Sequence, residues 1–202
     1  MKKEEKKQKV LKAAAECFAR YGYDKTTLED IGKVVGLNKA SLYYYYKNKE
    51  NIFCDVILQE ADVFMQDLQK KVRTARTAES RILNYMTERL NYYKNIVNLH
   101  NLSLDTIRKV EPIFNEIYDL VLQKEAAFIA GMLREGQESG EFSKADAQHT
   151  ADILLEIAIA IRYKAIHTSN ARMESDADYS RILEDTRYAS KLILKGLKVP
   201  QA

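Results

Sequence analysis

The sequence is poor in residues that interrupt regular structure, in residues that cross-link chains, and in long apolar runs. Its 202 residues include two prolines and seven glycines, too few turn-forming residues for a sandwich or barrel of many short strands. No run of about 18 uncharged apolar residues occurs, which excludes a membrane-spanning helix. The lysine-rich N-terminus is followed by no apolar segment, so we expect no secretory signal. Cys17 and Cys54 form no CxxC pair, which favours a reduced, cytoplasmic protein with two ordinary buried thiols.

The charged and apolar residues that are present favour a helical protein with a basic N-terminal segment. Charged residues make up 30% and apolar residues 46% of the chain, and the apolar residues recur at helical spacing almost to the end. Residues 1–50 carry twelve Lys and Arg against seven Asp and Glu, whereas residues 51–202 carry twenty against twenty-two. A basic segment joined to a slightly acidic one predicts an anionic polymer as the partner of the first segment.

Two short helices are expected at the start of the chain. The first covers residues 4–21 and ends at Gly22, which can adopt a positive φ. Thr26 followed three residues later by Glu29 has the form of a capping box. This pattern predicts a second helix that begins there and stops at Gly36.

A third helix follows after a tight turn that contains glycine. Asn38 is a good N-cap for it, with Leu42 facing inward, and Asn48 caps a fourth helix that begins at Lys49. Short helices joined by such a turn are typical of a helix-turn-helix unit. The alternative is a generic three-helix cap on a helical bundle.

The first turn of the third helix carries residue types that can read a DNA groove. Lys39 can bond a guanine or a phosphate, and Ala40 is small enough for a close approach to a base. Ser41 can bond a base edge or a phosphate. We therefore expect this turn to contact DNA.

The four tyrosines that follow point in different directions because successive helical residues lie about 100° apart. At least two of the rings must be exposed. We expect Tyr46 to lie in the core and Tyr43 and Tyr44 to contact the DNA backbone. Thr27 and Lys49 lie at helix starts, where unpaired N–H groups and the helix dipole favour a phosphate.

Three segments carry a resemblance to a known family. FARYGY at 18–23, TTLEDI at 26–31 and GLNKASLYYYYKNKE at 36–50 closely resemble the N-terminal signature of TetR-family transcriptional regulators, over about residues 8–56. The resemblance implies a homodimeric, all-helical repressor whose large domain binds a small effector. Relatives often have glycine or proline at position 40, so base preference cannot be transferred. Together with the N-cap Asn38, the predicted DNA-binding residues are Thr27, Lys39, Ala40, Ser41, Tyr43, Tyr44, Tyr45 and Lys49.

The rest of the chain predicts long helices, about nine in the whole protein. The expected fold is all-α, with a helix-turn-helix domain in residues 1–48 and a larger effector-binding and dimerisation bundle in residues 49–202. Pro112 is expected to start a helix, because a proline is tolerated in the first turn.

The last two helices are the predicted dimer interface. Residues 151–161 are apolar nearly all round, so this helix must be covered on more than one face. A four-helix interface between two chains would cover it, and the alternative is a wholly intramolecular core. The predicted interface residues are Leu154, Ile157, Ile161, Ile182, Thr186, Ala189 and Ile193.

Large apolar residues interleaved with tyrosines predict an effector pocket for a small, mainly apolar ligand. Few charges are expected to point inward, although Arg89 or His100 could supply one. The alternative is a DNA-binding protein of the same fold that is regulated by a protein partner and has no small-molecule effector. The predicted pocket residues are Met86, Leu90, Tyr93, Val97, Phe114, Ile117, Tyr118 and Val121.

An enzyme is the competing class, and the sequence does not favour it. His100, His149 and His167 are scattered, with no HExxH pair and no Cys/His cluster at metal-ligand spacing. No GxSxG elbow, phosphate-binding loop or dinucleotide-binding glycine motif is present. We therefore expect no catalytic site, no metal and no cofactor. The predicted partners are palindromic double-stranded DNA, a second copy of the chain and the effector.

Overall fold

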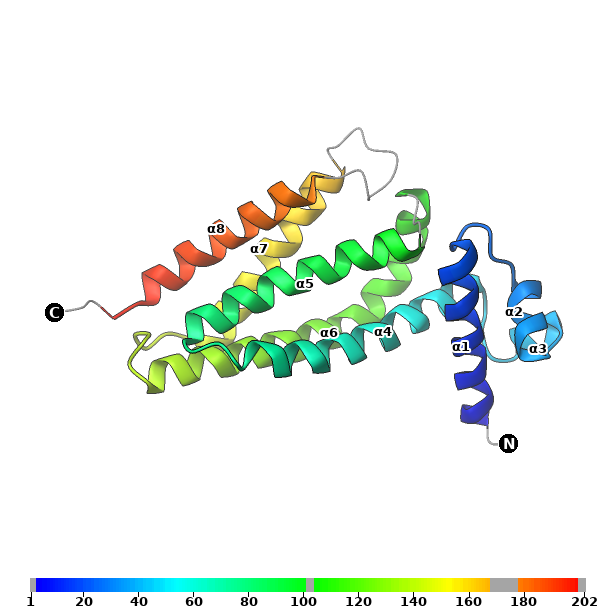
Figure 1. The fold of residues 1–202 in the computed structure, drawn as a ribbon, viewed down its shortest axis with the longest axis horizontal. Coiled ribbons are helices and arrows are strands. Elements are labelled where there is room, and N and C mark those ends of the chain that lie inside the picture. Colours follow the sequence, from blue (N-terminus) through cyan, green and yellow to red (C-terminus); the bar gives the residue numbers. More distant parts are fainter. Residues whose placement is uncertain (1–2, 101–103, 168–177, 200–202) are drawn as a thin grey trace. The chain divides into compact units, whose positions relative to one another are not determined.

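The computed structural model describes residues 3–100, 104–167 and 178–199. These residues form eight helices and no strand, which confirms the all-α fold and comes close to the expected nine helices. None of these helices combines the length and the hydropathy that a bilayer-spanning segment requires. The helices are α1 Lys3–Tyr21, α2 Leu28–Val35, α3 Lys39–Tyr43, α4 Lys49–Val72, α5 Ala78–His100, α6 Leu104–Glu138, α7 Ala147–His167 and α8 Tyr179–Leu197 (Figure 1).

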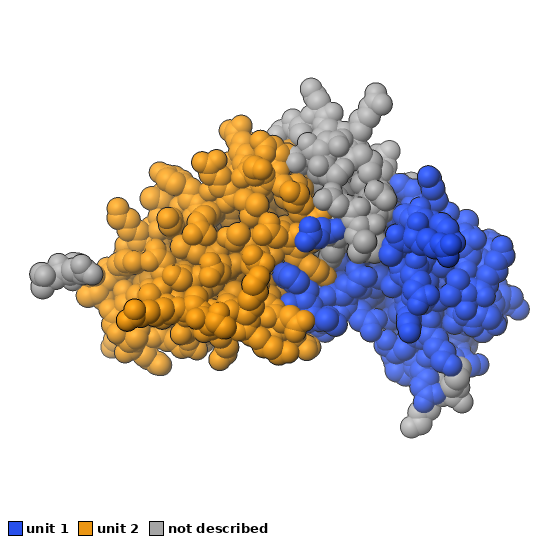
Figure 2. All heavy atoms as spheres, viewed as in Figure 1, with its two compact units in different colours: residues 1–64, 95–116, 172–176 blue, residues 65–94, 117–171, 177–202 orange. Residues whose placement is uncertain are grey.

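The chain forms two compact units (Figure 2). The first unit contains residues 1–64 and 95–116, and the second contains residues 65–94, 117–171 and 177–202. Helices α4, α5 and α6 each contribute residues to both units. The first unit therefore includes α1 to α3 together with one end of each of these three long helices.

The start of α2 lies one residue later than the sequence pattern predicts. Thr27 is the N-cap, and its hydroxyl accepts a hydrogen bond from the Asp30 N–H at 3.2 Å while the Asp30 carboxylate accepts one from the Thr27 N–H at 3.0 Å. The predicted Thr26 and Glu29 capping box was wrong. Thr26 is instead buried, and its hydroxyl donates to backbone carbonyls, including that of Gly22 at 2.8 Å.

The turn between α2 and α3 depends on two glycines. Gly36 caps α2 with a φ of 72°, a conformation that favours glycine. Gly32 lies so close to the carbonyl oxygen of Leu37 that a Cβ atom would overlap it. The predicted N-caps Asn38 and Asn48 are confirmed, because each side-chain oxygen accepts a backbone N–H three residues later at 2.8 Å.

An aromatic cluster forms the core of the first unit. The rings of Phe18, Tyr23 and Phe53 lie 4.7 to 5.6 Å apart between centroids, at the angles typical of buried aromatic contacts. Tyr46 is buried as expected, and its hydroxyl donates to the Asp55 carboxylate at 3.1 Å. This cluster joins α1 to the beginning of α4.

Both cysteines are buried free thiols in this unit. Burial raises the pKa of the Cys17 thiol, and it raises the pKa of the Cys54 thiol to about 12. The folded protein therefore keeps both groups protonated at neutral pH, which makes them poor nucleophiles.

Pro112 lies inside α6, so the prediction that it starts a helix was wrong. A proline has no N–H to donate to the carbonyl four residues earlier, so α6 lacks one helical hydrogen bond at this point. The eight residues 104–111 already form two helical turns before it.

A buried ion pair lies in the second unit. The Arg89 Nε atom is 2.8 and 3.0 Å from the two carboxylate oxygens of Glu125, and both side chains are only 2% exposed. Tyr85 donates its hydroxyl to the same carboxylate at 3.1 Å, and the Arg89 Nη2 atom donates to the Tyr93 hydroxyl at 3.3 Å. Arg89, which the sequence offers as a possible inward charge, is buried, and its counter-charge Glu125 was not expected from the sequence.

We predict that the substitution Glu125→Gln destabilises the protein by about 3 to 5 kcal/mol, because it leaves the Arg89 charge buried without its counter-charge. Denaturant unfolding followed by circular dichroism measures this free energy. The matched control is Glu135→Gln, which removes the partner of Arg81 in an ion pair of similar length, 2.7 Å, that is partly exposed. An exposed pair contributes about 1 kcal/mol or less, so equal losses in the two variants would contradict the prediction.

Candidate functional site

The exposed face of α3 is the candidate site for DNA. Leu42 is fully buried and anchors the helix, whereas Lys39 and Ala40 are exposed and Ser41 is partly exposed. Tyr43 and Tyr44 are 50% and 69% exposed, and Tyr45 is partly exposed. The structure thus places the predicted base-reading residues and Tyr43 on a helix of five residues, with Tyr44 as its C-cap and Tyr45 directly after it.

Lys39 already has a counter-charge on the neighbouring helix. Its ammonium group lies 2.6 Å from the Glu29 carboxylate, and both side chains are half exposed. This contact holds the pKa of Glu29 below its usual value and the pKa of Lys39 above its usual value. An exposed ion pair of this kind costs little to open, so Lys39 can exchange Glu29 for a phosphate.

The N-terminus of α2 is less favourable for a phosphate than the sequence pattern indicates. The Thr27 hydroxyl and N–H both donate to the Asp30 carboxylate, at 2.6 and 3.0 Å, and these hydrogen bonds hold the pKa of Asp30 below its usual value. Glu29 is a second acidic residue in the same turn. A phosphate approaching Thr27 therefore meets two carboxylates, and a contact between Thr27 and DNA stays a prediction.

Lys49 has a structural contact that the sequence pattern does not reveal. Its ammonium group donates to the carbonyl oxygens of Tyr23 at 2.9 Å and Thr26 at 3.0 Å, and it lies 4.1 Å from the centroid of the Tyr23 ring. Lys49 therefore holds the turn between α1 and α2 in the DNA-free chain. Its contact with DNA stays a prediction.

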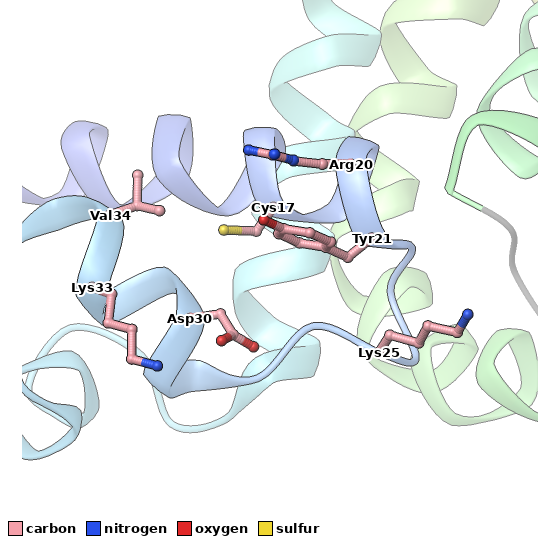
Figure 3. A pocket seen from close by; sticks show the side chains of 7 residues that line it. All are labelled: Cys17, Arg20, Tyr21, Lys25, Asp30, Lys33 and Val34. Atoms are coloured by element: carbon pink, nitrogen blue, oxygen red, sulfur yellow. The ribbon is translucent and has the colours of Figure 1, made fainter.

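A shallow groove between α1 and α2 adds cations that the sequence analysis missed. Figure 3 shows Arg20 on α1, Lys25 in the turn and Lys33 on α2 around this groove, which has a volume of about 480 Å³. None of the three forms an ion pair within the described part of the chain. They escape a sequence scan because they come from three separate elements. The remaining lining residues are Cys17, Tyr21, Asp30 and Val34.

The predicted pocket residues differ in how deeply the structure buries them. Met86 and Leu90 are fully buried, and Leu90 packs in an apolar cluster with Tyr179 and Ile182. Tyr93 and Val121 are partly exposed. The Tyr93 ring lies 4.9 Å from the Arg89 guanidinium and 5.1 Å from the Arg162 guanidinium. The side chains of Val97, Phe114, Ile117 and Tyr118 lie outside the described part of the structure.

The predicted dimer residues lie on α7 and α8, which pack side by side (Figure 1). Leu154, Ile182 and Thr186 are buried within the single chain. Ile157, Ile161, Ala189 and Ile193 are partly exposed. The largest exposed apolar side chains of this helix pair are others, namely Tyr163, Tyr188 and Leu192.

Comparison with known proteins identifies the family. Residues 10–56, which contain the whole α2–α3 unit, match the family model for bacterial regulatory proteins of the tetR family. The N-terminal segment of the chain therefore has the signature of the TetR family. This family consists of transcriptional regulators, a non-enzymatic class.

Relatives and solved structures extend the likeness to most of the chain. The crystal structure of a transcriptional regulator from Cytophaga hutchinsonii superimposes with a TM-score of 0.76 at 27% identity, over 94% of this chain and 97% of that one. The fatty acid metabolism regulator protein of Bacillus subtilis is 23% identical over 145 residues, 70% of this chain and 73% of that protein. The biofilm operon negative regulator IcaR of Staphylococcus epidermidis is 53% identical over 47 residues, 23% of this chain and 25% of that protein.

We predict that Lys39→Gln lowers the slope of log affinity against log salt by about one unit, because it removes one phosphate contact. Fluorescence anisotropy with labelled duplex at several salt concentrations measures the slope. Lys70→Gln is the matched control, since Lys70 also forms an exposed ion pair with an acidic residue but lies in the second unit. An unchanged slope in Lys39→Gln would remove this lysine from the phosphate contacts.

Proposed function

We propose that this TetR-family protein is a repressor that binds a palindromic operator as a homodimer and is released from it by a small, mainly apolar effector. The observation that carries the proposal is the exposed face of α3. A lysine, two small residues and one exposed tyrosine lie on this helix, a second exposed tyrosine is its C-cap, and one buried leucine anchors it. We assign DNA binding to residues 1–48, and effector binding and dimerisation to residues 49–202.

In this proposal, the residues of α3 divide by the kind of DNA contact. Ala40 and Ser41 face the base edges, because small side chains at the start of a recognition helix can approach them closely. Lys39, Tyr43 and Tyr44 bind phosphates and deoxyribose, and they position the helix without reading sequence. Tyr45 and Thr27 flank these contacts, and Asn38 supports them through its cap on α3.

We expect selection from random duplex DNA to return an inverted repeat whose half-sites lie about one or two helical turns apart. Ser41→Ala and Ala40→Ser change the preferred base at one position in each half-site. Tyr43→Phe is the control and weakens binding without changing the preferred sequence. If both α3 variants return the wild-type sequence, the assignment of base contacts is wrong. If the wild-type protein selects no sequence, the proposed function is wrong.

The dimer interface in this proposal is centred on the exposed face of α8. Tyr188 and Leu192 are 66% and 53% exposed and lie four residues apart, on the same face of the helix. Ala189 and Ile193 lie beside them and are partly exposed. A face of this kind needs a partner, and two copies related by a two-fold axis can cover it mutually.

We predict that Leu192→Glu weakens the dimer by about thirtyfold or more, as expected when a central interface residue worth about 2 kcal/mol is lost. Sedimentation at several protein concentrations measures the dissociation constant. Val63→Glu is the matched control, because Val63 is 60% exposed but lies on α4 in the first unit. A Leu192→Glu variant that dimerises like the wild type would contradict the interface.

The effector site in this proposal surrounds Tyr93 in the second unit. Its partly exposed ring lies 4.9 and 5.1 Å from two guanidinium groups, and we assign the buried Met86 and the partly exposed Val121 to the same site. Such a site suits a mainly apolar molecule with one polar end. A relative named as a fatty acid metabolism regulator supports this class of effector. The effector needs to favour the released conformation by about a hundredfold, or about 2.7 kcal/mol.

We expect native mass spectrometry of the purified protein to detect a bound apolar molecule, and we expect that molecule to release the selected DNA. Val121→Trp fills the site, so it keeps DNA binding but abolishes release. Val63→Trp is the control at an exposed valine and leaves release unchanged. If no compound of a broad apolar library raises the melting temperature or releases DNA, regulation by a protein partner replaces this part of the proposal.

A further inference from the structure

The short turn between α1 and α2 determines where α2 begins. Thr26 is buried at its end, and its hydroxyl donates to the carbonyl oxygens of Cys17 at 3.2 Å and Gly22 at 2.8 Å. The next residue, Thr27, is the N-cap of α2. Because no flexible residue separates the fixed Thr26 from the cap, a displacement of this turn displaces the start of α2.

The turn is held from α4 by three hydrogen bonds. Lys49 donates to the carbonyl oxygens of Tyr23 and Thr26, and Tyr23 donates its hydroxyl to the Glu50 carboxylate at 3.0 Å. Burial and the nearby Glu50 carboxylate raise the pKa of Tyr23, so this hydroxyl stays a donor. The Tyr23 ring also packs against the ring of Phe53, which lies on α4.

The turn is held from α6 by a contact between residues that are 82 positions apart. The Thr106 hydroxyl donates to the Asp24 carboxylate at 2.6 Å. This is the short distance typical of a hydroxyl bound to a charged acceptor. Thr106 is the third residue of α6 and is buried, whereas Asp24 is exposed. The α6 segment 104–116 belongs to the same compact unit as the turn, and the same helix continues into the second unit.

We propose that Thr106 is a positioning residue for DNA binding: through Asp24 it fixes the α1–α2 turn, and so it sets the orientation of α2 and of the α3 face that α2 supports. This proposal rests on the proposed function in DNA binding. Through Thr106, α6 contacts the turn that leads into the operator-binding helices, and α4 contacts the same turn through Lys49. A movement of α6 then changes operator affinity without any contact between α6 and DNA.

The isosteric substitution Thr106→Val tests the proposal in the full-length protein with the duplex that the wild type selects. We expect affinity to fall about tenfold, because a hydrogen bond to a charged group is lost and the turn must then be ordered on binding. The salt slope stays unchanged, since no phosphate contact is removed. Thr106→Ser keeps the hydroxyl and restores affinity to within about twofold. The control Thr150→Val removes a hydroxyl that donates to the Asp146 carbonyl at the start of α7, and it leaves affinity unchanged.

Asp24→Ala is the second test, and it acts at an exposed residue whose loss does not disturb the core. Removing a negative charge from a DNA-binding domain strengthens DNA binding by charge alone. If Asp24 holds the turn for α2, the same substitution weakens binding instead. Hydrogen exchange supplies a reading without DNA: the amides of residues 28–31 exchange faster in Thr106→Val and Asp24→Ala than in the wild type.

Two results overturn the inference. One is wild-type affinity and wild-type exchange at residues 28–31 in Thr106→Val, and the other is stronger DNA binding by Asp24→Ala. A wild-type protein that selects no DNA sequence refutes the proposed function instead, and the exchange measurement then still decides whether Thr106 positions α2.

Discussion

The burial of one leucine fixes the orientation of α3, the helix that we propose faces DNA. A helix of five residues is far below the length of about 12 to 15 residues at which isolated helices become stable in water, so α3 depends on tertiary support. Leu42 supplies that support against α2, where Gly32 permits a close approach of the chain. Every exposed residue of α3 takes its direction from this contact. The exposed tyrosines therefore present their rings to solvent without contributing to the core.

The cations of the N-terminal domain fall into two groups, those that have polar partners in the free chain and those that form no ion pair in the described residues. Lys39 and Lys49 already have partners in the free chain, the first a carboxylate and the second two carbonyl oxygens. Arg20, Lys25 and Lys33 surround the α1–α2 groove without ion pairs in the described residues. The cations at the groove can attract DNA from a distance, whereas those with partners must first exchange them. In the proposed function, this difference separates the residues that attract DNA during encounter from the residues that bind it in the complex.

The sequence predicts well what depends on neighbouring residues. The N-caps Asn38 and Asn48 and the end of α2 at Gly36 follow from local backbone chemistry, and all three were located correctly. Adjacent Thr26 and Thr27 are chemically identical candidates for the next cap, and only the carbonyls at the end of α1 select Thr26 for burial.

What the sequence misses depends on residues far apart in the chain. Arg89 and Glu125 are 36 residues apart, so no local pattern reveals that they pair. The cations of the α1–α2 groove come together only after folding. On α8, an apolar stripe can be covered by its own chain or by a second copy, and periodicity does not distinguish the two. Thr186 is buried in the single chain, whereas Leu192 on the same helix is exposed.

The proline in α6 gives this helix an uneven stiffness. Bending a helix requires its hydrogen bonds to lengthen on one side, and at Pro112 one of those bonds is already missing. A bend in α6 is therefore least costly near this residue. The two turns before it, which include Thr106, form a short lever that can tilt while the turns after it keep their own packing. Because the lever arm is short, a change of a few degrees at Pro112 produces only a displacement of about 1 Å at Thr106, at a rise of about 1.5 Å per residue. A hydrogen bond tolerates little more than that before it breaks, so α6 is suited to switch one contact rather than to move a domain.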